Sequence, residues 1–345
     1  MRSTIASGVM LAVGAALAFG VTTPVIAWAG AAIGPLTTAA LLYAGAAAAA
    51  LVFELARARQ APLRRADVPR LVAVAIAGGA VAPTLLAWGL QRAGAMTGAL
   101  LLNLEAVFTV ALAWLVYREP IGRRVALAVG CMVAGGAAIV LDRATLGEVG
   151  VLGALAVAGA TLAWAADNTW TRPLAERDPW QVILVKGAIG AALTGAAAVI
   201  RGEPLPALAP AAILLGCGAT GYGASLRLYL VAQRRIGAAR TGSVFALAPF
   251  IGAAVAWAVG DREAGAGTLV AAVLFGAGVA LHVTERHHHA HVHDSIDHDH
   301  VHRHDDGHHD HVHDPPVAGE HSHPHHHDRV EHDHDHGADL HHAHH

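Results

Sequence analysis

The sequence predicts an all-α integral membrane protein with ten transmembrane helices, arranged as two inverted five-helix repeats and followed by a disordered C-terminal tail. Three observations lead to this prediction. The 345 residues are 54% hydrophobic and 14% charged, with a mean hydropathy of +0.46, which lies outside the usual range of soluble domains. Apolar runs of about 20 residues, the length that crosses a bilayer as a helix, recur along the chain. One hairpin of two such runs is present twice.

The repeated hairpin is the feature around which the chain is organised. Its first copy covers residues 97–141, where two apolar runs flank a short charged break at residues 118–124. A break this short cannot hold a globular connection, so the two runs form a hairpin of membrane spans. Residues 241–283 repeat the plan at a nearly constant offset, with these matches: Thr97-Gly98 with Thr241-Gly242, Trp114 with Trp257, and Arg118-Glu119 with Arg262-Glu263.

Apolar segments that end at charges or at glycine and proline predict ten spans in all. They lie at residues 4–27, 35–55, 71–91, 96–117, 124–141, 149–170, 181–200, 209–231, 240–259 and 265–283. Alanine and glycine dominate these segments, which suits helix packing in lipid because small side chains let the backbones approach. Arg2 and the first apolar run resemble a signal peptide, but further spans follow at once, so we expect an uncleaved first span.

Basic residues in the predicted loops indicate the orientation of the chain, because Lys and Arg in short loops stay on the cytoplasmic side. The loops after spans two, four, six and eight hold 13 arginines, whereas the alternate loops hold four. We therefore expect a multi-pass protein of the inner cell membrane with both termini in the cytoplasm.

The five spans of each copy give the duplication a physical meaning. An odd number of spans makes the second copy enter the membrane upside down. This is the inverted-repeat plan of secondary transporters, whose substrate site lies near the midplane between the halves. The expected domains are a first repeat at residues 1–141, a second at 142–283 and a cytoplasmic tail at 284–345.

The first copy of the hairpin also resembles the signature of a known family. Its segment LLLNLEAVFTVALAWLVYREPIG is similar to that of the EamA family of the drug/metabolite transporter superfamily, where Leu-Glu-Pro precedes ten or so apolar residues and then Gly-Glu. Ala106 replaces the proline here, and the second copy keeps Pro249 but lacks the glutamate. The resemblance extends from the first predicted span to the last. It implies ten helices in two inverted halves and the transport, often outward, of small organic solutes.

Ionisable residues within the spans are candidates for the transport pathway. A charge in the hydrocarbon costs at least a few kcal/mol and therefore normally faces a cavity or a partner. Glu105 and Asp167 are the acids, Lys186 and Arg227 the bases, and two of each sign suggest pairing. Glu105 is either a protonatable group that couples transport to the proton gradient or a carboxylate bonded to a neighbouring helix end. For Arg227, snorkelling to the interface is the alternative to a cavity role.

Neutral residues complete the predicted transport cavity. Thr22 and Thr23 lie at the depth in the first span that Asp167 and Asn168 have in the sixth. Tryptophans in the spans line the cavity or, as is more usual, act as packing or interface anchors. The predicted cavity residues are Thr22, Thr23, Trp88, Asn103, Glu105, Trp164, Asp167, Asn168, Lys186 and Arg227.

The tail is chemically opposite to the body. Residues 284–345 contain 25 of the 26 histidines, 14 acidic residues and three arginines, which gives a formal charge of −11 against +8 for residues 1–283. With almost nothing apolar to bury, the tail should be disordered. Imidazole and carboxylate groups suit Zn, Ni, Co or Cu. The expected metal ligands are His287, His288, His289, His291, His293, His298, His300, His302, His304, His308, His309, His311, His313, His325, His326, His327, His332, His334 and His336.

The same histidines would make the tail respond to pH. With an imidazole pKa of about 6.5, roughly a quarter of them carry a charge near pH 7 and most of them at about pH 5.5. The tail would then change from acidic to basic. Metal or pH sensing at the cytoplasmic mouth is the resulting hypothesis, and a hydrophilic tail without such a role is its alternative.

Three function classes stay open from the sequence. The leading one is a secondary transporter, and more specifically an exporter, of a small organic metabolite that works by alternating access. The alternative is a divalent transition-metal transporter that uses the tail as collector or sensor, although the spans before His282 contain no histidine. The third is a non-transporting scaffold with a metal-storing tail.

Enzyme chemistry has no support, because the chain contains no nucleotide loop, nucleophile elbow or HExxH helix. We expect no required cofactor, and the tail is able to bind Zn, Ni or Co. The expected partners are the lipid bilayer, a small solute and transition-metal ions on the tail. Nucleic acid is not expected, and a homodimer stays open.

Overall fold

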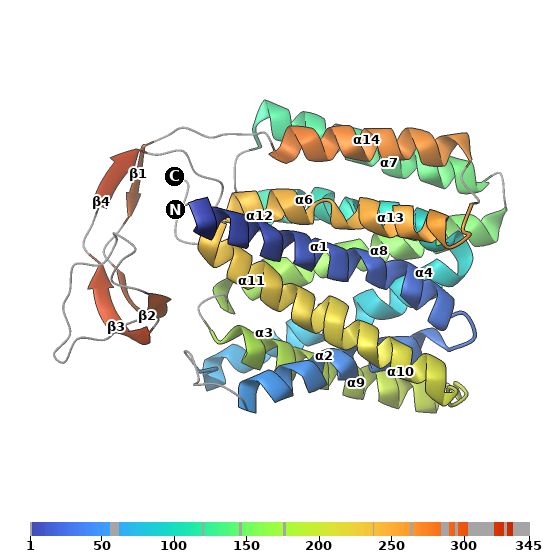
Figure 1. The fold of residues 1–345 in the computed structure, drawn as a ribbon, viewed down its shortest axis with the longest axis horizontal. Helices are drawn as coiled ribbons and strands as arrows, with labels where there is room; N and C mark the ends of the chain where they lie inside the picture. Colours follow the sequence, from blue (N-terminus) through green and yellow to red (C-terminus); the bar gives the residue numbers. More distant parts are fainter. Residues whose placement is uncertain are drawn as a thin grey trace.

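The body of the protein is a bundle of long helices that run side by side (Figure 1). The computed structural model describes residues 2–55, 62–118, 121–144, 147–174, 177–236, 238–262 and 265–283 of this body, and residues 290–293, 296–302, 321–327 and 330–333 of the tail. Some helices cross the bundle in one piece, whereas others are joined from shorter pieces.

The described helices follow the chain in this order: α1 (Arg2–Ala29), α2 (Pro35–Leu55), α3 (Val68–Val74), α4 (Ala82–Ala93), α5 (Ala95–Leu101), α6 (Leu104–Tyr117), α7 (Arg123–Ala144), α8 (Glu148–Thr171), α9 (Pro179–Ile200), α10 (Leu208–Cys217), α11 (Ser225–Ile236), α12 (Ala238–Phe245), α13 (Ala248–Ala258) and α14 (Ala266–Val283). Two π-helical stretches, η2 (Ala75–Val81) and η4 (Gly218–Ala224), join α3 to α4 and α10 to α11. Two 3₁₀ turns, η1 (Arg65–Asp67) and η3 (Arg172–Leu174), precede α3 and follow α8.

Nine helical segments among the described residues are long and apolar enough to cross a membrane. They are Ala6–Ala29, Pro35–Leu55, Arg65–Ala93, Ala95–Tyr117, Arg123–Ala144, Glu148–Leu174, Pro179–Ile200, Arg240–Ala258 and Ala266–Val283. Each overlaps a predicted span, which confirms a helical membrane body.

The span predicted at residues 209–231 is not one of these nine. It lies within α10, η4 and α11, which form one unbroken helical run. The difference arises from composition, because η4 contains Gly218, Gly221 and Gly223, and Arg227 follows in α11. This run is therefore less apolar than the other spans, although it is long enough to cross a bilayer.

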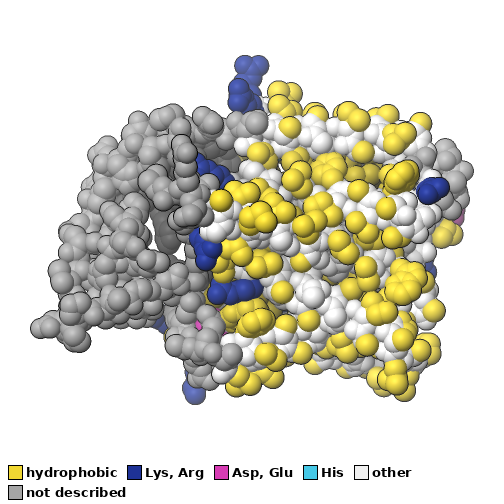
Figure 2. All heavy atoms as spheres, viewed as in Figure 1, with side chains coloured by type: hydrophobic (Ala, Val, Ile, Leu, Met, Phe, Trp, Pro, Cys, Tyr) yellow, Lys and Arg dark blue, Asp and Glu magenta, His cyan; other side chains and the backbone are white. Residues whose placement is uncertain are grey.

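The surface of the bundle is apolar around its middle. Figure 2 shows hydrophobic side chains over the whole central part of the visible face, while most Lys and Arg side chains in this view lie at the end beside the N-terminus. Large apolar side chains inside the helices, such as Val273, Met10 and Val133, are 72%, 69% and 50% exposed. An apolar surface of this extent suits contact with lipid tails.

Helices from the two halves of the chain pack in matching combinations. Helix α2 packs on α9, and α7 packs on α14. Helix α8 packs on α4 and α6, and α1 packs in the same way on α11 and α13. The stretch η2 contacts α9 while η4 contacts α2. The starts of these two π-helical stretches, Ala75 and Gly218, are separated by the same offset as Trp114 and Trp257 of the repeated hairpin.

The described part of the tail differs from the prediction of disorder. Strand β1 (Ala290–His293) pairs antiparallel with β4 (Val330–Asp333), and β2 (Ile296–His302) pairs antiparallel with β3 (His321–His327). Backbone pairing of this kind needs no apolar core, and alternating His and Asp are compatible with extended chain. The predicted ligands outside the described residues are His287, His288, His289, His304, His308, His309, His311, His313, His334 and His336.

Candidate functional site

An ion pair lies inside the helix bundle. Asp167 of α8 is 2% exposed, and its carboxylate pairs with the ammonium group of Lys186 on α9. The hydroxyl of Thr171, one turn further along α8, donates to the second oxygen of Asp167 at 3.2 Å. A carboxylate this deeply buried is stable only when a cation or hydrogen-bond donors compensate its charge. Lys186 and Thr171 provide both kinds of compensation.

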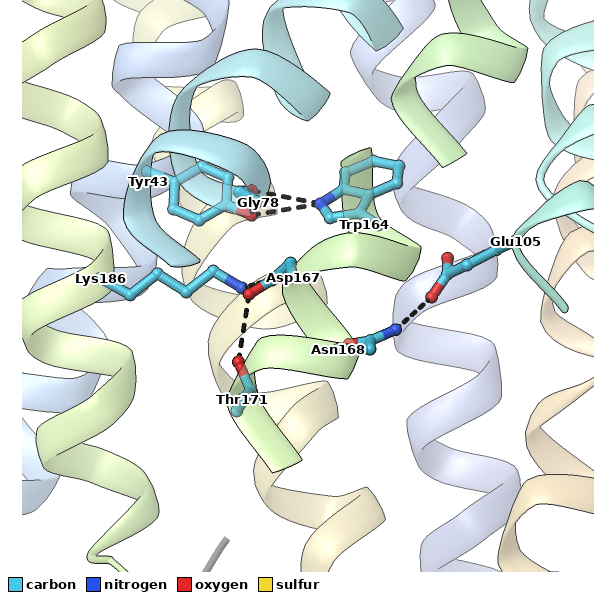
Figure 3. Close-up of polar contacts among 8 residues, drawn as sticks. All are labelled: Tyr43, Gly78, Glu105, Trp164, Asp167, Asn168, Thr171 and Lys186. Atoms are coloured by element: carbon cyan, nitrogen blue, oxygen red, sulfur yellow. Dashed lines mark hydrogen bonds and ion pairs between the residues drawn. The ribbon is translucent and has the colours of Figure 1, made fainter. Parts of the chain in front are cut away.

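The π-helical turn of η2 lies directly against this ion pair. The carbonyl oxygen of Gly78 accepts hydrogen bonds from the hydroxyl of Tyr43 and, at 3.2 Å, from the indole N–H of Trp164. A Cβ atom at Gly78 would overlap the Asp167 carboxylate, so this position requires glycine. Irregular π-helical turns are frequent at functional sites. Figure 3 shows Tyr43, Gly78 and Trp164 together on one side of Asp167 and Lys186.

A second polar contact uses the next residue of α8. Asn168 donates from its side-chain amide to Oε1 of Glu105 on α6 at 2.7 Å. Asp167 and Asn168 point to different sides of α8, one toward Lys186 and the other toward Glu105 (Figure 3). Glu105 is half-buried and Asn168 is exposed. Among the described residues, Asn168 is the one hydrogen-bond partner of the Glu105 carboxylate. We call Glu105, Asn168, Asp167 and Lys186 the polar seam.

A row of aromatic rings connects this polar seam with α11 and α12. The Tyr222 ring of η4 lies 5.6 Å from Tyr43 and 6.2 Å from Trp164, measured between ring centroids. Phe19 of α1 lies 5.9 Å from Tyr222 and 5.5 Å from Phe245. The row ends at Tyr229 of α11, which is 5.1 Å from Phe245. We call Phe19, Tyr222, Tyr229 and Phe245 the aromatic row; all four are half-buried.

The chain matches one known family along most of its length. The sequence profile of the EamA-like transporter family matches residues 6–141 and, a second time, residues 151–284. The chain belongs to the EamA-like transporter family. Together with the membrane-length helical segments of the described chain, this assignment identifies a multi-pass membrane protein.

Individual proteins are also similar to this EamA-like chain, and they include the following two. An "Uncharacterized transporter" from Methanothermobacter thermautotrophicus is 28% identical over 208 residues, which are 58% of this chain and 60% of that protein. The match therefore spans less than two thirds of the relative. A solved structure described as "Crystal structure of protein" has a TM-score of 0.56 at 19% sequence identity, and the match covers 80% of this chain and 96% of that one. This second likeness concerns the fold alone.

The EamA-like body brings five of the predicted cavity residues into contact networks. Trp164, Asp167 and Lys186 lie in one network, and Glu105 and Asn168 form the other. The sequence suggests that the two acids and two bases pair with each other. The structure shows one such pair, Asp167 with Lys186.

Thr22 and Thr23 are buried in α1. The hydroxyl of Thr22 donates to the carbonyl of Ala18 at 2.7 Å. A Cβ atom at Gly221 in η4 would overlap this hydroxyl. In the same way, a Cβ atom at Gly78 in η2 would overlap the carboxylate of Asp167. Thr22 and Asp167 therefore meet corresponding glycines of the two π-helical stretches.

Asn103 and Trp88, two further predicted residues, make local contacts within the chain. Asn103 is buried and donates to the carbonyl of Leu100 at 2.9 Å, which is a local helix contact. The guanidinium group of Arg92 lies over the ring of Trp88, with 3.8 Å between its central carbon and the centroid of that ring. Arg227 is half-buried on α11.

The matched tryptophans of the repeated hairpin face outward. Trp114 and Trp257 are 56% and 54% exposed. Exposure of this extent on a membrane helix suits an interface anchor rather than a residue that lines a cavity.

Tyr43, Gly78, Thr171 and the aromatic row are site residues that sequence reasoning missed. A signal was present for Tyr43, which is separated from Lys186 by the same offset as Trp114 from Trp257 and so occupies the same register of its repeat. Gly78 and Gly221 share this offset. Aligning the two repeats residue by residue would have selected both positions.

Proposed function

We propose that the protein is a secondary transporter that moves a small organic solute across the membrane by alternating access. The observation that carries the proposal is a pair of polar contacts between membrane-length helices, Asp167 with Lys186 and Glu105 with Asn168. Charges inside a membrane protein are costly and usually mark a pathway for substrate or ions. Both contacts involve α8, and the first links it to η2 through Gly78.

We further propose that the body consists of ten spans in two inverted halves, residues 1–141 and 142–283. The family profile matches twice, and the two matches divide the chain near the same point. The matching helix contacts and the corresponding places of η2 and η4 support the same division. Substrate sites of inverted-repeat transporters lie between the halves. The polar seam fulfils this condition, because Glu105 belongs to the first half and Asp167 and Lys186 to the second.

We propose that the protein lies in the inner cell membrane with both termini in the cytoplasm. We also propose that it exports its solute. The arginine distribution between alternate loops supports this orientation. The start of α1 and the end of α14 lie at the same end of the bundle (Figure 1), as an even number of spans requires.

Metal transport through the body receives less support. Among the described residues, no group of three or more His, Cys, Asp or Glu side chains is placed to hold a metal ion. We therefore propose that Zn, Ni or Co binds to the tail alone, where the sequence concentrates histidine and acid.

Flux measurements in proteoliposomes test the proposed function. Vesicles loaded with a panel of radiolabelled organic cations, anions and zwitterions should release at least one class through the wild-type protein. Release should be lost in the Asp167→Asn, Lys186→Met double variant, which removes both charges together. Glu148→Gln, at an exposed acid at the start of α8, is the control and should behave like wild type. Release that persists in the double variant for every solute would exclude the polar seam as the pathway.

A further inference from the structure

The charges of the polar seam are not balanced within the described part of the chain. The carboxylate of Asp167 has its cation, Lys186. The carboxylate of Glu105 has only a neutral amide, that of Asn168, although it interacts electrostatically with Lys186 at longer range. The polar seam therefore carries one carboxylate without a directly bonded cation.

Glu105 also has capacity to bind another donor. A carboxylate has two oxygens and about four acceptor positions. One hydrogen bond, from Asn168 to Oε1, uses a single position. Glu105 is half-buried and Asn168 is exposed, so neither side chain is enclosed by protein. Figure 3 shows the second carboxylate oxygen of Glu105 without a bond to the other residues drawn.

The charged groups that face Glu105 come from α8 and α9. Asp167 from α8 repels its charge, and Lys186 from α9 attracts it. The two groups of opposite charge, Asp167 and Lys186, are bonded to each other, so their fields largely cancel at a distance.

The aromatic row supplies the apolar half of a binding site. Its rings are half-buried, in contrast to Tyr43 and Trp164, which are 4% and 7% exposed. The row meets the polar seam at Tyr222, whose ring centroid is 6.2 Å from that of Trp164, and Trp164 lies one turn before Asn168, the partner of Glu105, on α8. Aromatic faces attract both apolar groups and cations. A carboxylate beside such faces suits a ligand that is positively charged at one end and apolar at the other.

We propose that the polar seam binds an organic ammonium ion with an apolar body, whose N–H groups donate to Glu105 while the body packs against the aromatic row. The proposal rests on the proposed transport function and specifies the substrate class of the same site. An anionic solute is disfavoured, because Lys186 is already paired and its release would leave Asp167 buried without a cation. A neutral solute would leave the charge of Glu105 without compensation.

Three probes of similar shape and different charge test the proposal. They are 2-phenylethylammonium, 2-phenylethanol and 3-phenylpropionate, titrated calorimetrically into the full-length protein in detergent near pH 7.5. We expect the ammonium to bind at least about tenfold more tightly than the other two probes, a ratio that corresponds to about 1.4 kcal/mol. Equal affinities, tighter binding of the carboxylate, or no binding of the ammonium at about 10 mM would overturn the proposal.

Variants then test the assignment to Glu105. Glu105→Gln keeps an acceptor for Asn168 and removes the charge, so it should weaken ammonium binding at least about tenfold and leave 2-phenylethanol unaffected. Tyr222→Leu should weaken all three probes. Glu148→Gln makes the same chemical change at an exposed acid and should not alter binding. Unchanged ammonium affinity in Glu105→Gln would refute the role of this carboxylate, and the melting temperature of each variant shows whether it is folded.

Binding and flux separate this inference from the proposed function. If vesicles release anions but not amines, the transporter proposal stands and the ammonium site is wrong. If the ammonium binds through Glu105 but no solute of any class is released, the site stands and the transport proposal fails.

Discussion

The ion pair of Asp167 and Lys186 leads to a quantitative prediction about stability. Lys186→Met leaves a carboxylate that is 2% exposed with only the Thr171 hydroxyl, at 3.2 Å, as its remaining partner. Removing one member of a buried pair typically costs about 3 to 5 kcal/mol, because the other charge stays buried without compensation. We expect a loss of this size in the single variant, seen as a marked fall in the thermal unfolding midpoint in detergent.

The double variant Asp167→Asn, Lys186→Met should behave differently. With both charges removed, the desolvation cost disappears together with the attraction, so its stability should return to within about 1 kcal/mol of wild type or exceed it. The two single variants and the double variant form a thermodynamic cycle, whose coupling free energy should reach at least about 2 kcal/mol. A coupling near zero, or a double variant as unstable as the single one, would refute the view of Asp167 and Lys186 as a mutually dependent pair.

Three further changes have definite expected outcomes. Gly78→Ala would push a methyl group into the Asp167 carboxylate, so it should lower the free energy of unfolding by about 1 to 3 kcal/mol and reduce flux. Gly216→Ala is the control and should be tolerated, because nothing lies within 4 Å of the added carbon. Equal melting temperatures of the two variants would contradict the close contact at Gly78. Tyr43→Phe removes one of two donors to the Gly78 carbonyl, so unfolding should become easier by about 1 kcal/mol, and an unchanged midpoint would show that this bond contributes nothing. Deleting residues 287–345 should abolish Zn and Ni binding in equilibrium dialysis while leaving solute flux intact, and metal retention by the shortened protein would place the ions in the body.

The sequence predicts the helical body well because span length and hydropathy are local properties. Nine of the ten predicted spans are helices of sufficient length and apolarity in the described chain. The exception, residues 209–231, shows the limit of this reasoning. Its glycine-rich centre reduces hydropathy, yet the same glycines let η4 approach α1 closely, as the contact between Gly221 and Thr22 shows. Amino-acid composition reveals the lower hydropathy of this segment but not the close approach of η4 to α1.

The candidate site was predicted in part for a different physical reason. Buried charges are conspicuous in an apolar sequence, so Asp167 and Lys186 could be selected and their pairing expected. Tyr43 and Gly78 lie beside this ion pair because η2 adopts a π-helical turn, which no local sequence motif predicts. Trp88 packs under Arg92 of the same helix, and whether it could also line the interior depends on which face of α4 turns inward. Contacts between helices are decided by register and rotation, and a single sequence states neither directly.

The two π-helical turns η2 and η4 differ in the side chain that each one contacts. Both have an irregular backbone at equivalent places, but the side chain that fills the adjoining space is Asp167 in one case and Thr22 in the other. The turn η2 therefore rests against a charge that must keep its partner, whereas η4 rests against a neutral hydroxyl. Separating α8 from η2 should consequently cost more free energy than separating α1 from η4.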